Sequence, residues 1–175
     1  MKLLPTFAAA SVFGALLLPV AVFTSPSSQS APLDLAQESL KGPLKDYVVV
    51  NKTPNSVSNT ISALKREFEN RNFIVKGVID HQKIAKSQGL TIPPNTALLV
   101  GQPSFEAPII KANPVGSLFV PLTIVVWRSG ETTYIAYWNP KTDFGNNLGT
   151  NADKDATNAI NTMTNTLVEI VRSVV

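Results

Sequence analysis

Two apolar runs separated by a four-residue connection constrain the fold more than any other feature of this sequence. Residues 119–127 and 132–138 are rich in β-branched and aromatic side chains, and the connection Arg128-Ser129-Gly130-Glu131 contains a glycine. A connection this short joins two strands only when they are antiparallel, and glycine supplies the backbone freedom that a tight turn requires. The sequence therefore predicts a β-hairpin within an antiparallel sheet.

The last part of the chain predicts a long helix that packs on this sheet. Its apolar residues recur at steps of four, three, four and three, which places them on one helical face: Ala156, Ile160, Met163, Leu167 and Ile170. Asn151 or Asp153 precedes this stretch and is expected to cap it. The opposite face carries Asn and Thr rather than charge, so the apolar stripe is the face expected to meet the sheet.

The rest of the sequence adds strands and shorter helices. Strand patterns occupy residues 47–50, 73–79 and 96–100. Helical patterns occupy residues 57–68, 84–85 and 104–112. Ser104 is expected to cap the last of these, and residues 141–149 read as a polar loop. Antiparallel strands with helices gathered on one face indicate an α+β domain of two layers.

The N-terminus has the order of a secretory signal peptide. Lys2 is followed by an uncharged, mostly apolar stretch over residues 3–23 and then by small polar residues. We expect residues 1–30 to be cleaved after Ser30, with residues 31–46 as a linker and 47–175 as a single α+β domain. The protein would then be secreted or periplasmic. The alternative is an uncleaved anchor helix, which would be its only association with a membrane.

Composition excludes several function classes. The chain has no cysteine and one histidine, so thiolate or multi-histidine metal sites and cysteine nucleophiles are excluded. We expect no metal and no cofactor. The net charge of +3 lies on a sparsely charged chain, which is unlike the basic patch of a nucleic-acid binder. No Gly-x-Ser-x-Gly motif and no paired carboxylates are present, so no catalytic residue is assigned.

Landmarks over residues 53–140 resemble the bacterial and archaeal domain-of-unknown-function family 302. They are Asp80-His81, Ala85, Gly89-Leu90, Pro94, Gly101-Gln102-Pro103, Pro121-Leu122, Trp127, Tyr137 and Asn139-Pro140. The resemblance implies a fold similar to the TATA-box-binding protein, with a curved antiparallel sheet backed by helices, and a homodimer. The family usually has Gly-Asn-Pro where this chain has Gly101-Gln102-Pro103. It has no settled activity, so the resemblance bears on fold rather than function.

Three features could form a ligand site, and each also has a purely structural interpretation. His81 is the one side chain whose charge changes near neutral pH, but it could simply bond a loop carbonyl. Gly101 and Gln102 join a strand to a helix start, where N–H groups can hold an anion, or they form only a tight turn. Trp127 and Tyr137 could stack on a planar ligand, or they belong to ordinary packing.

We therefore predict an exported, non-catalytic module that binds a small molecule near His81. The alternatives are a structural or protein-interaction domain without a pocket, and a hydrolase or isomerase that uses His81. A site shared by His81 and Gln102 requires their strand ends to lie on one side of the sheet. The connection between the two strands permits a crossover or an antiparallel return, and an antiparallel return would place these residues at opposite ends.

Overall fold

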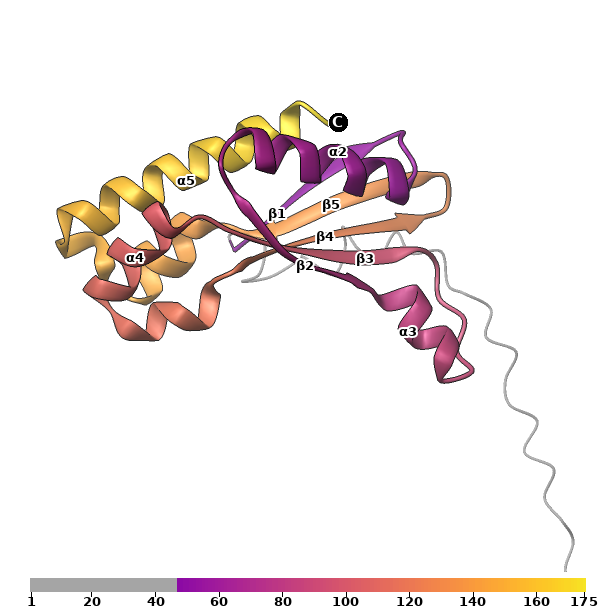
Figure 1. Ribbon diagram of the computed structural model, residues 1–175, viewed down its shortest axis with the longest axis horizontal. Coiled ribbons are helices and arrows are strands. Elements are labelled where there is room, and N and C mark those ends of the chain that lie inside the picture. Colours follow the sequence, from indigo (N-terminus) through magenta and orange to yellow (C-terminus); the bar gives the residue numbers. More distant parts are fainter. Residues whose placement is uncertain (1–46) are drawn as a thin grey trace, which may run out of the picture. The chain divides into compact units, whose positions relative to one another are not determined.

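The computed structural model describes residues 47–175, which form a five-stranded antiparallel sheet with helices (Figure 1). The expected signal peptide and linker lie outside the described residues. The strand order is β1-β5-β4-β3-β2. The strands are β1 (Val48–Thr53), β2 (Ile74–Asp80), β3 (Asn95–Gly101), β4 (Leu122–Ser129) and β5 (Thr132–Trp138). The predicted α+β fold with a curved antiparallel sheet is confirmed, and β4 and β5 form the predicted hairpin.

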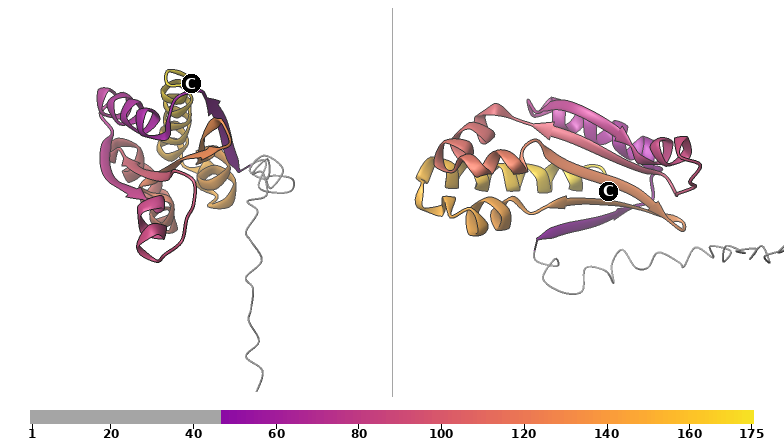
Figure 2. Two further views of the ribbon diagram at one scale, coloured as in Figure 1. Left: turned by 90° about the vertical axis from the view of Figure 1, so that its right-hand side faces the viewer. Right: turned by 90° about the horizontal axis from the view of Figure 1, so that it is seen from below.

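The two long helices lie on one face of this sheet. They are α2 (Val57–Asn70) and α5 (Lys154–Arg172), and the right panel of Figure 2 shows the sheet from below with both helices behind it. The shorter helices are α3 (His81–Ser87), which follows β2, and α4 (Pro103–Ala112), which packs against α5. Three further helical turns are η2 (Pro114–Phe119), η3 (Lys141–Asn147) and η4 (Thr150–Ala152).

Local capping and apolar stripes explain both long helices. The Ser56 hydroxyl accepts a hydrogen bond from the Asn59 N–H at 3.2 Å, and an Asp153 carboxylate oxygen accepts one from the Ala156 N–H at 2.9 Å. Such caps satisfy N–H groups that have no partner within the helix. The Asp153 bond shows that Asp153, rather than Asn151, is the cap of α5. The predicted apolar stripes form the buried faces of both helices.

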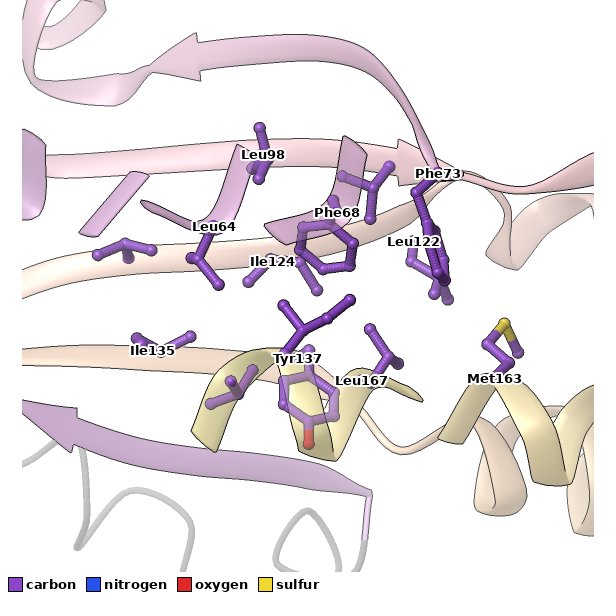
Figure 3. Close-up of a cluster of buried hydrophobic side chains, with 14 of the residues drawn as sticks. Leu64, Phe68, Phe73, Leu98, Leu122, Ile124, Ile135, Tyr137, Met163 and Leu167 are labelled. Carbon is purple, nitrogen blue, oxygen red and sulfur yellow. The ribbon is translucent and has the colours of Figure 1, made fainter. Parts of the chain in front are cut away.

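The core fills the space between these helices and the sheet. Figure 3 shows side chains from β3, β4 and β5 meeting those of α2 and α5. The labelled residues are Leu64, Phe68, Phe73, Leu98, Leu122, Ile124, Ile135, Tyr137, Met163 and Leu167. Because side chains alternate across a strand, the intervening residues of β3, β4 and β5 lie on the other face. We call this other side, over which neither long helix lies, the helix-free face.

Two local expectations are corrected. Helix α4 begins at Pro103 with Gln102 at its N-cap, and no side chain caps it, so Ser104 is not the cap. Residues 141–149 are not simply a polar loop, because η3 is helical and buries Asp143 and Phe144. The Phe144 ring packs edge-on against Phe119, with centroids 5.8 Å apart. This packing draws a polar segment into the domain.

Candidate functional site

The register of β2 and β3 separates two parts of the predicted site. These strands are antiparallel, with Asp80 opposite Thr96 and Ile74 opposite Gly101. Thr96 and Gly101 lie five residues apart along β3, which corresponds to about 17 Å of extended strand. His81 directly follows Asp80, at the Thr96 end of β3, and Gln102 directly follows Gly101, at the other end. The expected rim shared by His81 and Gln102 is therefore not formed, because the connection is an antiparallel return.

His81 is the exposed first residue of α3. The preceding Asp80 caps that helix, and its carboxylate accepts a hydrogen bond from the Lys83 N–H at 2.9 Å. Asp80 also lines two grooves of about 650 and 480 Å³, and His81 lines neither of them. Ligand binding by His81 itself stays a prediction, and neither of these two grooves supports it.

The Gly101 turn is occupied by an ion pair of the chain itself. The Lys76 ammonium lies 2.9 and 3.1 Å from the two carboxylate oxygens of Glu106, and this pair passes over Gly101. A Cβ at position 101 would collide with the Glu106 carboxylate and lie 2.7 Å from the Lys76 Nζ. The next side chain, Gln102, has a buried Oε1 without a hydrogen-bond partner. A carboxylate already at this turn disfavours an anion site.

The aromatic residues of the hairpin divide between the two faces of the sheet. Trp127 stacks on Tyr134 on the helix-free face, with ring centroids 5.2 Å apart and planes at 15°. The Lys52 ammonium lies 5.6 Å from the centroid of the Tyr134 ring. Tyr137 belongs to the core on the opposite face and lies beside Leu167 in Figure 3. Trp127 and Tyr137 therefore lie on opposite faces, and they line different pockets.

A pocket at the Gly101 end of the sheet is the strongest candidate site. It has a volume of about 280 Å³ and lies where the start of β4, the end of β5, η2, η3 and α5 meet. We call it the Asp143 pocket. It is lined by Leu118, Phe119, Pro121, Leu122, Thr123, Tyr137, Trp138, Pro140, Asp143, Phe144 and Leu167. Of the predicted site residues, Tyr137 is the one found here.

The Asp143 pocket combines an exposed apolar rim with a buried carboxylate. Leu118 is 80% exposed and Trp138 is 47% exposed, whereas Asp143 is only 4% exposed. Exposed apolar side chains that gather into a contiguous patch mark candidate binding sites, and Leu118 and Trp138 both line this cavity. Small-molecule pockets characteristically pair apolar walls with a few placed polar groups, and this arrangement has that character.

Burial controls the acid–base properties of the pocket. It raises the pKa of Asp143 from 3.8 to about 6, because the charged carboxylate loses its hydration. Burial also raises the pKa of Tyr137, and the positive charge of Arg172 partly opposes this effect. Within residues 47–175 the Asp143 side chain has no hydrogen bond or ion pair. The carboxylate is therefore largely withdrawn from solvent and has no partner in that part of the chain.

Sequence reasoning missed Asp143 because the surrounding residues are polar. The one local signal was Phe144, an isolated aromatic residue among Asn, Gly, Thr and Lys. Its burial depends on Phe119, which lies 25 residues earlier in the chain. Pattern reasoning from neighbouring residues cannot detect such a contact.

The described part of the chain holds neither a cluster of metal-ligating side chains nor a helix suited to span a membrane. Among residues 47–175, no three or more His, Asp or Glu side chains gather closely enough to hold a metal ion. No helix in the same range is long and apolar enough to cross a membrane.

The fold and the pocket together define a small α+β domain with a ligand-sized cavity at one end of its sheet. The sequence matches the family described as "Domain of unknown function DUF302" over residues 49–170. The chain belongs to this family. No curated protein matches the sequence.

A solved structure supports the fold. It is described as an uncharacterized conserved protein DUF302 from Bacillus stearothermophilus, and it is similar to this chain with a TM-score of 0.64 and 19% sequence identity. The similarity covers 73% of this chain and 98% of that one. At this identity the likeness bears on the fold alone.

Proposed function

We propose that this protein is an exported, non-catalytic binding module that holds a small, mainly apolar molecule in the Asp143 pocket. The observation that carries the proposal is the combination of an apolar cavity, an exposed rim at Leu118 and Trp138, and one buried carboxylate. The proposal moves the site away from His81, which lines neither groove beside Asp80. The pocket volume of about 280 Å³ suits a molecule smaller than a typical drug.

The lining of the pocket favours binding over catalysis. Its titratable groups are the Asp143 carboxyl and the Tyr137 phenol, and its one aliphatic hydroxyl belongs to Thr123. A nucleophile needs a base within hydrogen-bond reach and a third group that orients the base. Among the lining residues no histidine, lysine or second carboxylate could complete such a set.

An NMR titration tests this function. Benzyl alcohol is added to the ¹⁵N-labelled protein, to Trp138→Ala and to Leu90→Ala, in which another exposed apolar residue is truncated away from the pocket lining. We expect saturable shifts of the amides around Leu118, Trp138 and Phe144 in the wild type and in Leu90→Ala, and a severalfold weaker response in Trp138→Ala. Absent shifts, or shifts spread over the surface, would overturn the proposal.

Export is the second part of the proposal. It rests on the order of residues 1–30, in which Lys2 precedes an uncharged apolar stretch and a small-residue tail. N-terminal sequencing of the protein recovered outside the cytoplasm should begin near Ala31. Recovery of the protein with an intact Met1 in the membrane fraction would contradict cleavage and indicate an uncleaved membrane anchor instead.

A second candidate function is protein interaction, with a second copy of this chain as the partner. The register places one apolar residue from each strand in a row across the helix-free face: Val50, Ala136, Val125, Ala97 and Ile79. From strand spacing and length, the five strands span about 400–500 Å² of sheet face per copy. Two copies would bury about 800–1,000 Å², close to the lower limit of a specific interface. The apolar row, rather than the size of this area, is what favours the homodimer that the resemblance implies.

A further inference from the structure

We infer that the Asp143 pocket recognises a small organic ammonium ion, such as a methylated amine, rather than a neutral or anionic molecule. The inference rests on the proposed function and deepens it by naming the chemical class of the ligand. It follows from two independent features of the lining, the set of aromatic rings and the placement of the carboxylate.

Four of the eleven lining residues carry aromatic rings: Phe119, Tyr137, Trp138 and Phe144. They come from different elements, since Phe119 ends η2, Phe144 belongs to η3, and the other two are consecutive residues at the end of β5. The face of an aromatic ring is electronegative and attracts a cation, and proteins bind quaternary and methylated ammonium groups between such rings. The walls therefore suit a cation that carries methyl groups.

The charge distribution around the pocket favours a cation as well. Asp143 supplies a buried negative charge, and none of the lining residues is basic. Two positive groups lie outside the lining: Arg172 of α5, whose charge acts on the Tyr137 phenol, and the exposed Lys141, which begins η3 two residues before Asp143. A buried carboxylate without a counter-ion is unfavourable. A bound ammonium ion would supply that counter-ion, whereas an anion would be repelled.

The arrangement also explains why both kinds of residue are needed. Aromatic walls remove the hydration of a methylated ammonium ion, and the carboxylate replaces that hydration with a direct ionic interaction. A neutral molecule of the same shape would fill the cavity but leave the Asp143 charge uncompensated. We therefore expect about tenfold discrimination between a cation and its neutral isostere, which is the scale of one desolvated cation–aromatic or charged contact.

The test compares two probes that differ in charge but hardly in shape. Choline and 3,3-dimethylbutan-1-ol are titrated by isothermal calorimetry into the full-length protein, Asp143→Asn and Glu131→Gln. The control removes one negative charge from a side chain that is 99% exposed and lies in the turn at the far end of the hairpin. Circular dichroism checks that each variant is folded.

The expected result is that choline binds the wild type and Glu131→Gln about tenfold more tightly than the alcohol, and that Asp143→Asn abolishes this difference. Choline does not titrate, so its affinity for the wild type should fall below about pH 6, where Asp143 becomes protonated. The affinity for Asp143→Asn should not change over this range. Tyr137 is the other titratable side chain of the lining, and its raised pKa keeps it neutral there.

Three results would overturn the inference, and they have different consequences for the proposed function. Equal affinities for choline and the alcohol would refute recognition of the charge but leave a binding pocket in place. If neither choline nor the alcohol binds while benzyl alcohol still shifts the amides at the rim, the assignment of an ammonium ligand is refuted but the binding pocket stands. Failure of all three probes would remove the proposed function together with the inference.

Discussion

Replacement of Asp143 by Asn should stabilise the ligand-free protein at neutral pH. The side chain is 4% exposed, and no partner for its carboxylate occurs among the described residues. Asparagine has nearly the same volume but no charge, so the substitution removes the energetic penalty of an uncompensated buried anion. A stabilising substitution inside a pocket is unusual, because most single changes at buried positions destabilise a protein.

The pKa of Asp143 sets the magnitude and the pH range of this effect. Moving the pKa of a carboxyl from 3.8 to about 6 corresponds to about 3 kcal/mol. The folded protein binds the Asp143 proton more tightly than the unfolded chain does. The penalty is therefore fully present above about pH 6 and disappears as the pH falls below the ordinary value of 3.8. We expect the free energy of unfolding of Asp143→Asn to exceed that of the wild type by about 1–3 kcal/mol near neutral pH. The lower part of this range applies where water entering the pocket reduces the penalty.

Urea denaturation followed by circular dichroism measures this difference. The free energy of unfolding is compared for the wild type, Asp143→Asn and Glu131→Gln at several pH values between about 3.5 and 7.5, where the gap should close as the pH falls. Glu131→Gln controls for the loss of one charge, since that side chain is 99% exposed. A variant that is less stable than the wild type near neutral pH, or a gap that is independent of pH, would refute the assignment of Asp143 as an unpaired buried carboxylate.

Three further predictions concern the fold and the assembly. Leu167→Ala should destabilise the domain by about 2–5 kcal/mol in the same assay, because Leu167 is fully buried between α5 and the sheet; a loss below about 0.5 kcal/mol would contradict its place in the core. Gly101→Ala should displace the Lys76–Glu106 ion pair, so the free energy of unfolding should depend less on salt concentration than in the wild type. An unchanged salt dependence would contradict the close approach. Val125→Lys should convert a dimer into a monomer in light scattering after size exclusion, whereas Asn165→Lys on an exposed position of α5 should not; a monomeric wild type would refute the interface.

The amphipathic helices and the hairpin could be predicted because their signals are local. In α2 and α5 the apolar residues lie three or four positions apart, and a Ser or Asp cap precedes each stripe. In the hairpin, strand residues flank a turn that contains Gly130 at a φ of 55°. Each of these patterns lies within about 20 residues, the range over which sequence periodicity carries information.

The site could not be predicted because it depends on contacts between distant segments. Whether His81 meets Gln102 depends on the direction of the connection between β2 and β3, and the length of that connection permits both directions. The Asp143 pocket requires η3 to fold against Phe119 and Leu167, which no local pattern of residues 141–149 reveals. Tyr137 was predicted for its aromatic character, but it lies in the core and lines the Asp143 pocket, on the opposite face of the sheet from the Trp127–Tyr134 stack with which it was grouped.

Native mass spectrometry of the full protein purified from its own host tests the central claim most directly. We predict that the wild type carries a bound molecule of low mass that fits a cavity of about 280 Å³, and that Trp138→Ala, purified in parallel, has lost most of it. Leu90→Ala, altered at an exposed apolar residue outside the Asp143 pocket, should retain it. A wild type without any bound molecule, or one whose bound molecule is unaffected by Trp138→Ala, would contradict the assignment of this pocket as the functional site.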